Sequence, residues 1–316
     1  MPRFPLALAL LAASCGGTGA GAAASATPGG AASAPATAGA ARSSVRRLQA
    51  TLDRLGAELA WRSPGTQAAL AVTDLASGAR ASLAGEVLFV SASSAKVWWV
   101  AAALHHVGVA AVEPMADPIF IDSDNGATGE VIDLVGPDRV NDYIWNVVGM
   151  RSTALTHWNY HHKREATNSP HRMGSDNYTT ANDALVFLER LQRGAILDRE
   201  RSAALLSWMK RSPRSGLGGW LLARLPPSVR AGAAHKAGWL DPGCCSNDRT
   251  YNTLNEVGIV TVPGGATYAV AILTHAGDNY WGRQVPFVEY ASCEIYRAVA
   301  GDPALDCRRP GDPTGP

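Results

Sequence analysis

The chain has 316 residues, of which 47% are hydrophobic, and its formal net charge is +1. This length and composition suit one large globular domain or two closely packed ones. The near-neutral charge gives no support for a nucleic-acid partner or an anionic membrane surface, and five cysteines are too few for a fold held mainly by disulfides.

The first fifteen residues have the pattern of an export signal. Arg3 supplies a positive start, and residues 4–13 form an apolar run that is shorter than the roughly 20 residues a membrane-spanning helix needs. The run ends at Ala12-Ala13-Ser14-Cys15, which resembles a bacterial lipoprotein cleavage box. Lipidated Cys15 would then tether the protein to a membrane, with plain secretion as the alternative. In both cases we expect an exported protein, extracellular or periplasmic.

Two terminal segments are predicted to lack a fold of their own. Residues 16–42 are almost wholly Gly, Ala, Ser, Thr and Pro, and they bury too little apolar surface to offset their chain entropy. Residues 308–316 form a polar, proline-rich tail. We therefore expect a signal peptide at 1–15, a disordered linker at 16–42, a folded domain at 43–307 and a disordered tail at 308–316.

Hydrophobic periodicity and turn residues predict the elements of this domain in chain order. Helices are expected at residues 45–59, 95–106, 137–148, 180–191, 199–210 and 284–299, and strands at 68–75, 79–83, 233–237, 257–262 and 268–274. Thr180 with Asp183 is the expected N-cap pair of one helix. Strands from both ends thus bracket a helical middle, which favours one sheet, a second helical lobe and a site between them.

A serine followed by a lysine three residues later can place a base beside a nucleophile on one helix face. Ser93-Ser94-Ala95-Lys96 has this spacing at the start of a predicted helix, where free N–H groups stabilise developing negative charge. Ser207-Trp208-Met209-Lys210 has the same spacing, but it lies within an amphipathic helix, so we interpret it as structural.

Two further motifs follow. Ser123-Asp124-Asn125 comes thirty residues after Ser93, and Lys236-Ala237-Gly238 lies at the end of the strand predicted at 233–237. Ser175-Asp176-Asn177 repeats the first of these, and we interpret that copy as a polar loop with capping residues.

The order Ser-x-x-Lys, Ser-Asp-Asn and Lys-Thr-Gly marks serine β-lactamases and penicillin-binding proteins. With one change in the third motif, the chain resembles class A β-lactamases over roughly residues 44–300. The resemblance implies an α/β (α+β) two-lobe fold, in which an antiparallel sheet from both chain ends packs against a mainly helical lobe. Residues 43–307 would be the catalytic domain.

The resemblance also implies roles for the motif residues. Ser93 would be the nucleophile, Lys96 and Ser123 would move protons, and Asn125 would bind the acyl side-chain amide of a substrate. The backbone N–H groups of Ser93 and Trp239 would form the oxyanion hole.

The third motif departs from the family at its middle position. Lys236 would still attract the substrate carboxylate, and Gly238 would still allow close approach of the ligand. Ala237 stands where the family has a hydroxyl, so we expect weaker carboxylate binding, or help from another group such as Arg249.

The position of the residue that hydrolyses the acyl-enzyme is ambiguous. In the family a glutamate and an asparagine on an omega loop hold the hydrolytic water. Counting forward from Gly149 puts this glutamate at Asn159, whereas counting back from Thr180 puts it next to Glu165, with Asn168 as the asparagine. Either Glu165 is a displaced base or the base is absent and Asn159 takes its place.

The remaining metal-binding and disulfide signals are weak. His157, His161, His162 and His171 lack companion ligands at convincing spacing, so we interpret them as loop residues and expect no metal and no organic cofactor. Four cysteines allow three pairings; they are Cys244, Cys245, Cys293 and Cys307.

The sequence therefore predicts a monomeric serine hydrolase of the class A β-lactamase type, acylated at Ser93 by a small-molecule β-lactam or peptide-like acyl substrate. Deacylation is expected to be slow. The alternatives are a D-Ala-D-Ala carboxypeptidase, another serine esterase or amidase, and a sensor that binds β-lactams without hydrolysing them.

Overall fold

The computed structural model describes residues 34–158, 165–171, 175–241, 251–277 and 280–313. Its centre is a five-stranded antiparallel sheet in the order β2-β1-β7-β6-β5. The strands are β1 Thr66–Asp74, β2 Arg80–Leu83, β5 Ala234–Leu240, β6 Asn252–Thr261 and β7 Thr267–Ala276. The first two come from the start of the domain and the last three from its end, as the sequence predicts.

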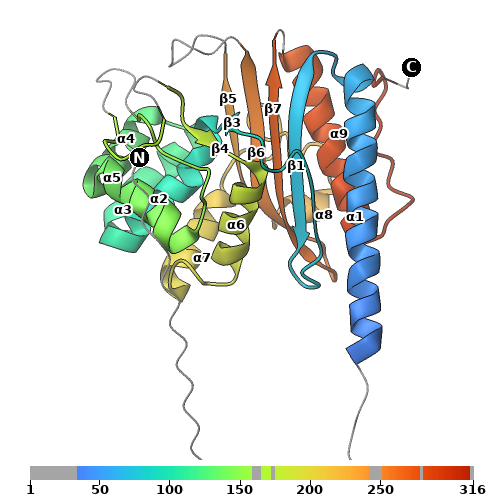
Figure 1. Cartoon of the computed structure of the whole chain (residues 1–316), viewed down its shortest axis with the longest axis horizontal. Coiled ribbons are helices and arrows are strands. Elements are labelled where there is room, and N and C mark those ends of the chain that lie inside the picture. The colour runs from blue at the N-terminus through green and yellow to red at the C-terminus, as the bar shows by residue number, and fades with distance from the viewer. Residues whose placement is uncertain (1–33, 159–164, 172–174, 242–250, 278–279, 314–316) are drawn as a thin grey trace, which may run out of the picture.

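Helices lie on both sides of this sheet (Figure 1). The long terminal helices α1 Ala34–Arg62 and α9 Tyr280–Ala300 pack together beside it. The other side carries the helical lobe, made of η1 Ala92–Ala95, α2 Lys96–Val107, α3 Val109–Asp117, η2 Pro118–Asp122, α4 Asn125–Val135, α5 Pro137–Asp142, η3 Tyr143–Val148, α6 Ala181–Gln192 and α7 Arg199–Met209. The short helix α8 Pro227–Arg230 and the strand pair β3 Phe89–Val90 and β4 Tyr178–Thr179 complete the described elements.

The side chains of β1 alternate between two hydrophobic cores, because successive residues of a strand point to opposite faces. Ala69 and Ala71 belong to the core under the helical lobe. Leu70 and Val72 belong to the core under α1 and α9. The sheet is therefore covered on both faces, and the functional side chains are confined to the edge strand β5 and the lobe beside it.

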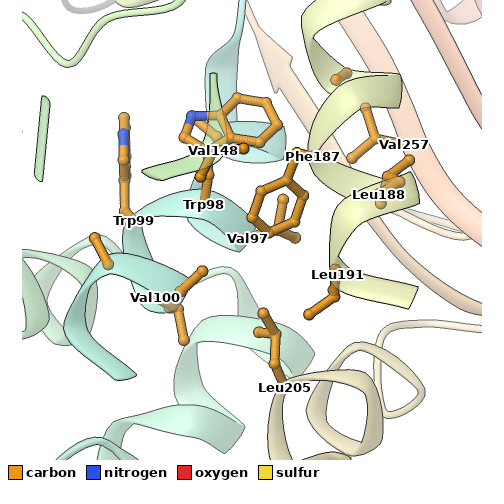
Figure 2. Packing of buried hydrophobic residues seen from close by; sticks show 14 of the residues in the cluster. Val97, Trp98, Trp99, Val100, Val148, Phe187, Leu188, Leu191, Leu205 and Val257 are labelled. Atoms are coloured by element: carbon orange, nitrogen blue, oxygen red, sulfur yellow. The ribbon is translucent and has the colours of Figure 1, made fainter. Parts of the chain in front are cut away.

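Helix α2 is the centre of the lobe and is apolar around its whole circumference, as expected for a helix surrounded by protein. Every residue from Lys96 to Leu104 is buried. Trp98 meets Phe187 of α6 edge to face, with ring centroids 6.0 Å apart, and Val257 of β6 belongs to the same core (Figure 2). This packing fixes the start of α2, where Lys96 lies, against the sheet.

The predicted helices and strands are all present, and apart from the start of α1 their ends differ by a few residues. Thr180 caps α6 as predicted, and its hydroxyl accepts a hydrogen bond of 3.0 Å from the backbone N–H of Asp183. Lys210 follows α7 and is exposed, while Trp208 and Met209 are buried, so the second Ser-x-x-Lys copy is structural as interpreted.

Two predicted boundaries are wrong. Helix α1 begins at Ala34, inside the predicted linker, because alanine has the highest helix propensity and Leu48, Leu52 and Leu55 anchor the same helix in the core. The tail is also held to the domain as far as Asp312. The Arg224 guanidinium donates a 2.8 Å hydrogen bond to the Cys307 carbonyl and forms an ion pair with Asp312.

A disulfide joins Cys293 of α9 to Cys307, which is one of the pairings left open by the sequence. Cys244 and Cys245 lie outside the described residues, as does Cys15. Within the described ranges, no helix combines the length and the apolar character that crossing a membrane requires.

Candidate active site

Ser93 lies in the short turn η1, directly before α2, at the junction of the sheet and the lobe. The preceding residue, Ala92, has φ of 48°, a left-handed conformation that costs roughly 1–3 kcal/mol for a residue other than glycine. The turn is fixed on both sides of Ser93. The Ser91 N–H donates to the Asn177 carbonyl at 2.8 Å, and the Ser94 hydroxyl donates to the Ser91 carbonyl at 2.5 Å.

Lys96 extends from the first turn of α2 into a polar pocket of the lobe. Only 2% of the residue is exposed. Its ammonium donates to the Ser123 carbonyl at 2.5 Å, to the Ser123 hydroxyl at 3.2 Å and to the Asn125 side-chain oxygen at 2.8 Å. Burial, followed by the nearby charge of Lys236, lowers the pKa of Lys96 well below its ordinary value. This shift favours the neutral amine, which is the form that can act as a base.

Ser123 connects the lobe to the sheet. It ends η2 with φ of 56°, and this left-handed conformation places it between two lysines. Its hydroxyl accepts a 2.9 Å hydrogen bond from the Lys236 ammonium, which also donates to the Ala237 carbonyl at 3.0 Å. Burial lowers the pKa of Lys236 to about 8, although the charge of Glu256 opposes this shift. Lys236 thus remains mainly protonated at neutral pH.

Gly238 brings the edge strand β5 against the backbone of the nucleophile turn. A Cβ atom at this position would lie 2.7 Å from the Ser93 nitrogen and 2.4 Å from the Ser94 nitrogen, which is closer than any side chain allows. Strand β5 pairs with β6 on one edge only, so its other edge faces η1. The Ser93 nitrogen is therefore brought against Gly238, the residue directly before Trp239.

Two neighbouring pockets open at this junction. The first contains Ser93, Lys96 and Asn125 in its lining. The second has a volume of about 240 Å³ and includes Ser123, Lys236 and Ala237. Since Lys96 and Lys236 both bind Ser123, this serine marks the boundary between the two pockets. The predicted nucleophile Ser93 and the three groups Lys96, Ser123 and Lys236 are thus brought together at this junction.

Glu165 and Asn168, two of the residues predicted to hold the hydrolytic water, do not line the first pocket. Its described lining does not include Glu165, which is half-buried and forms a backbone bridge to His157. Asn168 also lies outside the lining, and its amide donates to the Asp138 carbonyl at 3.0 Å and accepts from Asn141 at 2.9 Å. Asn159 lies outside the described residues. The Ala166 N–H donates to the Thr156 carbonyl at 2.8 Å, so these two residues lie side by side.

The first pocket instead contains three residues that the sequence analysis assigned to structural loops. They are His157, Asp176 and Asn177. The last two belong to the second Ser-Asp-Asn copy, which we interpreted as a capping loop, and this interpretation is incomplete. The absence of a glutamate at the counted position is the one sequence signal that could have drawn attention to them.

His235 lies directly before Lys236 on β5. His235 is fully buried, and its ring nitrogens lie 3.1 Å from the Glu256 carboxylate and 2.9 Å from the Pro213 carbonyl, so it is a structural residue of β5. Arg249, His161 and His162 lie outside the described residues. Among the described residues, no three His, Cys, Asp or Glu side chains converge as a metal site.

Comparison with solved structures supports the fold. A class A beta-lactamase from Bacteroides cellulosilyticus DSM 14838 is 15% identical, with a TM-score of 0.66 over 81% of this chain and 99% of the other. A class A beta-lactamase of the last common ancestor of Gram-negative bacteria is 21% identical, with a TM-score of 0.64 over 79% and 99%. PBP-A is 20% identical, with a TM-score of 0.63 over 80% and 97%.

No curated protein sequence matches the chain. A family model described as "Beta-lactamase enzyme family" matches residues 110–299, which is more than half of the chain. The matched segment contains Ser123 and Lys236, and Ser93 and Lys96 lie shortly before it. The chain belongs to the beta-lactamase enzyme family, as a serine hydrolase with the two-lobe class A fold.

Proposed function

We propose that the protein hydrolyses β-lactams through an acyl-enzyme formed at Ser93. The observation that carries this proposal is the convergence of Lys96 and Lys236 on the Ser123 hydroxyl, beside the pocket that contains Ser93. This arrangement supplies a nucleophile, a base and a proton path to a leaving nitrogen.

In the acylation step, the neutral Lys96 amine takes the proton from the Ser93 hydroxyl as its oxygen attacks the β-lactam carbonyl carbon. Negative charge develops on the carbonyl oxygen, where the N–H groups of Ser93 and Trp239 stabilise it. The amide C–N bond then breaks, and Ser123 donates its proton to the departing nitrogen. Ser123 regains a proton from the lysines that bind its hydroxyl.

The second pocket fits the carboxylate found on β-lactam rings. Lys236 lines it and is mainly charged at neutral pH. Ala237 contributes a methyl group where a hydroxyl would add a second donor, so the binding of the carboxylate rests mainly on Lys236. Asn125 lines the first pocket and binds the acyl side-chain amide of the substrate.

Deacylation is the slower half of the proposed cycle, because neither Glu165 nor Asn168 lines the pocket of Ser93. The acyl-enzyme should accumulate and give a burst followed by slow turnover. Release of product distinguishes a hydrolase from a sensor that only traps the antibiotic, and turnover of D-Ala-D-Ala peptides would identify a carboxypeptidase.

The test is covalent labelling by a fluorescent penicillin combined with hydrolysis of a chromogenic cephalosporin. Ser93→Ala should abolish both signals. Ser207→Ala is the matched control, because it removes the serine of the second Ser-x-x-Lys copy, and it should retain both. Labelling that survives in Ser93→Ala would overturn the assignment of the nucleophile.

We also propose that the protein is exported and tethered through lipidated Cys15. The signal-like sequence of residues 1–15 supports export, and the Cys293–Cys307 disulfide suits an oxidising compartment. In bacterial cells, the wild-type protein should fractionate with membranes and Cys15→Ser should not. A wild-type protein found in the soluble periplasmic or culture fraction would favour plain secretion.

A further inference from the structure

The wall of the Ser93 pocket is formed by a histidine and a carboxylate from two separate segments. His157 and Asp176 both line the pocket that contains Ser93 and Lys96. His157 is 7% exposed and Asp176 is 2% exposed. Together these two residues place two ionisable groups in the lining of the pocket that contains Ser93.

Asn177 fixes this wall to the nucleophile turn. Its side-chain oxygen accepts hydrogen bonds from the N–H groups of Thr156 and His157 at 2.6 and 3.1 Å, and its amide donates to the His157 carbonyl at 2.8 Å. Its backbone carbonyl accepts from the Ser91 N–H at 2.8 Å and from the Ser91 hydroxyl at 3.1 Å. The backbone at His157 is therefore held in a fixed relation to the residue two positions before the nucleophile.

The charge state of His157 suits a base. Burial lowers its pKa below the ordinary value, and the carboxylates of Asp176 and Glu165 oppose this shift. The imidazole is therefore neutral at pH 7, and the adjacent Asp176 charge stabilises the imidazolium that forms when a proton is taken up.

The pocket has room for a water molecule. Its volume is about 20 Å³, and a cavity needs roughly 10–15 Å³ to hold one water. The lining also supplies the Ser93 and Asn125 side chains as polar partners.

We propose that His157, oriented by Asp176, activates the water that hydrolyses the acyl-Ser93 ester; this inference rests on the proposed function. The imidazole takes one proton from the water, whose oxygen forms a bond to the acyl carbonyl carbon. The tetrahedral intermediate collapses with cleavage of the ester bond to the Ser93 oxygen. The imidazolium returns its proton to that oxygen, directly or through Lys96, so that free serine and the product acid are released.

The experiment measures acylation and deacylation separately, with stopped-flow labelling and mass spectrometry of the acyl-enzyme. His157→Ala should deacylate at least about 100-fold more slowly, the size expected for loss of a general base, while its acylation rate stays within about threefold of wild type. Added imidazole should restore part of the deacylation rate, which a purely structural role would not permit. Asp176→Asn should slow deacylation about tenfold, because it acts through His157.

His171→Ala is the matched control, since His171 packs against Tyr178 and is not among the described residues that line the pocket. It should leave the acylation and deacylation rates unchanged.

Deacylation at the wild-type rate in His157→Ala would overturn the inference, as would a 100-fold loss of deacylation rate in Glu165→Gln alone. If His157→Ala fails to become acylated, the acylation and deacylation rates of His157→Gln and Asp176→Asn are compared with those of wild type instead. A wild-type protein that penicillin does not acylate would instead overturn the proposed function, and this inference with it.

Discussion

Lys96 and Lys236 donate to the same acceptor, the hydroxyl of Ser123, at 3.2 and 2.9 Å. Two buried ammonium groups on one oxygen repel each other, so the protonation of one disfavours that of the other. The pKa of Lys96 is accordingly lowered by burial first and by Lys236 second. The fold thus gives two chemically identical side chains different environments, as the proposed roles of Lys96 as base and Lys236 as cation require.

Replacing Lys236 by methionine should shift the pH dependence of acylation. Lys96 accepts a proton only when neutral, so the acylation rate falls as the pH falls through its pKa. Without the Lys236 charge, the pKa of Lys96 rises, and this acidic limb should move to higher pH in Lys236→Met. The measurement is the rate of penicillin labelling against pH. Lys210→Met is the control, because Lys210 is exposed after α7, and an unmoved limb in Lys236→Met would show that the two lysines are not coupled.

Gly238→Ala should damage both the stability and the active site. The new Cβ would lie 2.7 Å from the Ser93 nitrogen and 2.4 Å from the Ser94 nitrogen, and neither backbone atom can yield without moving the nucleophile. We expect a loss of about 1–3 kcal/mol in the free energy of unfolding and, since small displacements of reacting groups cost about 100-fold, a comparable fall in acylation rate.

Gly277→Ala is the control for this substitution, because a Cβ there would meet nothing within 4 Å. Thermal unfolding and penicillin labelling should be unchanged in it. Wild-type acylation in Gly238→Ala would mean that β5 and the nucleophile turn are farther apart than the structure shows.

The sequence predicts those parts of the molecule that local chemistry determines. The apolar circumference of α2 and the Thr180 cap are properties of a few neighbouring residues, and both are observed. The placement of Ser93, Lys96, Ser123 and Lys236 followed from motifs whose spacing reflects a shared function.

The presence of His157 and Asp176 in the lining of the Ser93 pocket was not predictable in this way. The geometry of this lining depends on hydrogen bonds between segments about 20 residues apart, such as those of Asn177 to Thr156 and His157. Counting along a loop of altered length identified Glu165 as the candidate base. The second Ser-Asp-Asn copy gave no local indication that Asp176 would line the pocket of Ser93.

Ala237→Thr should raise kcat/KM for β-lactams that carry a carboxylate. Ala237 lines the second pocket with Ser123 and Lys236, and an aligned hydroxyl would add a charge-assisted hydrogen bond of about 1.5–3 kcal/mol, or roughly tenfold or more in rate. Ala237→Val has nearly the same shape without the hydroxyl and should show no gain. Equal values for the two variants would mean that volume, not hydrogen bonding, governs this position.

The Cys293–Cys307 disulfide should stabilise the protein without affecting catalysis. Both cysteines are buried in the core under α1 and α9, on the face of the sheet opposite the helical lobe. The bridge spans a sequence separation of 14 residues, and closing a loop of that size stabilises a protein by about 3 kcal/mol in the chain-entropy model.

The double variant Cys293→Ala/Cys307→Ala should therefore unfold at a temperature lower by roughly 6–12 °C, taking about 2–4 °C per kcal/mol for a domain of this size. Its penicillin labelling rate at 25 °C should equal that of wild type, because Arg224 still holds the tail through the Cys307 carbonyl and Asp312. Arg224→Met in the double variant should then release the tail and lower the unfolding temperature further. An unfolding temperature that does not change in the double variant would show that Arg224, rather than the disulfide, fixes the end of the chain.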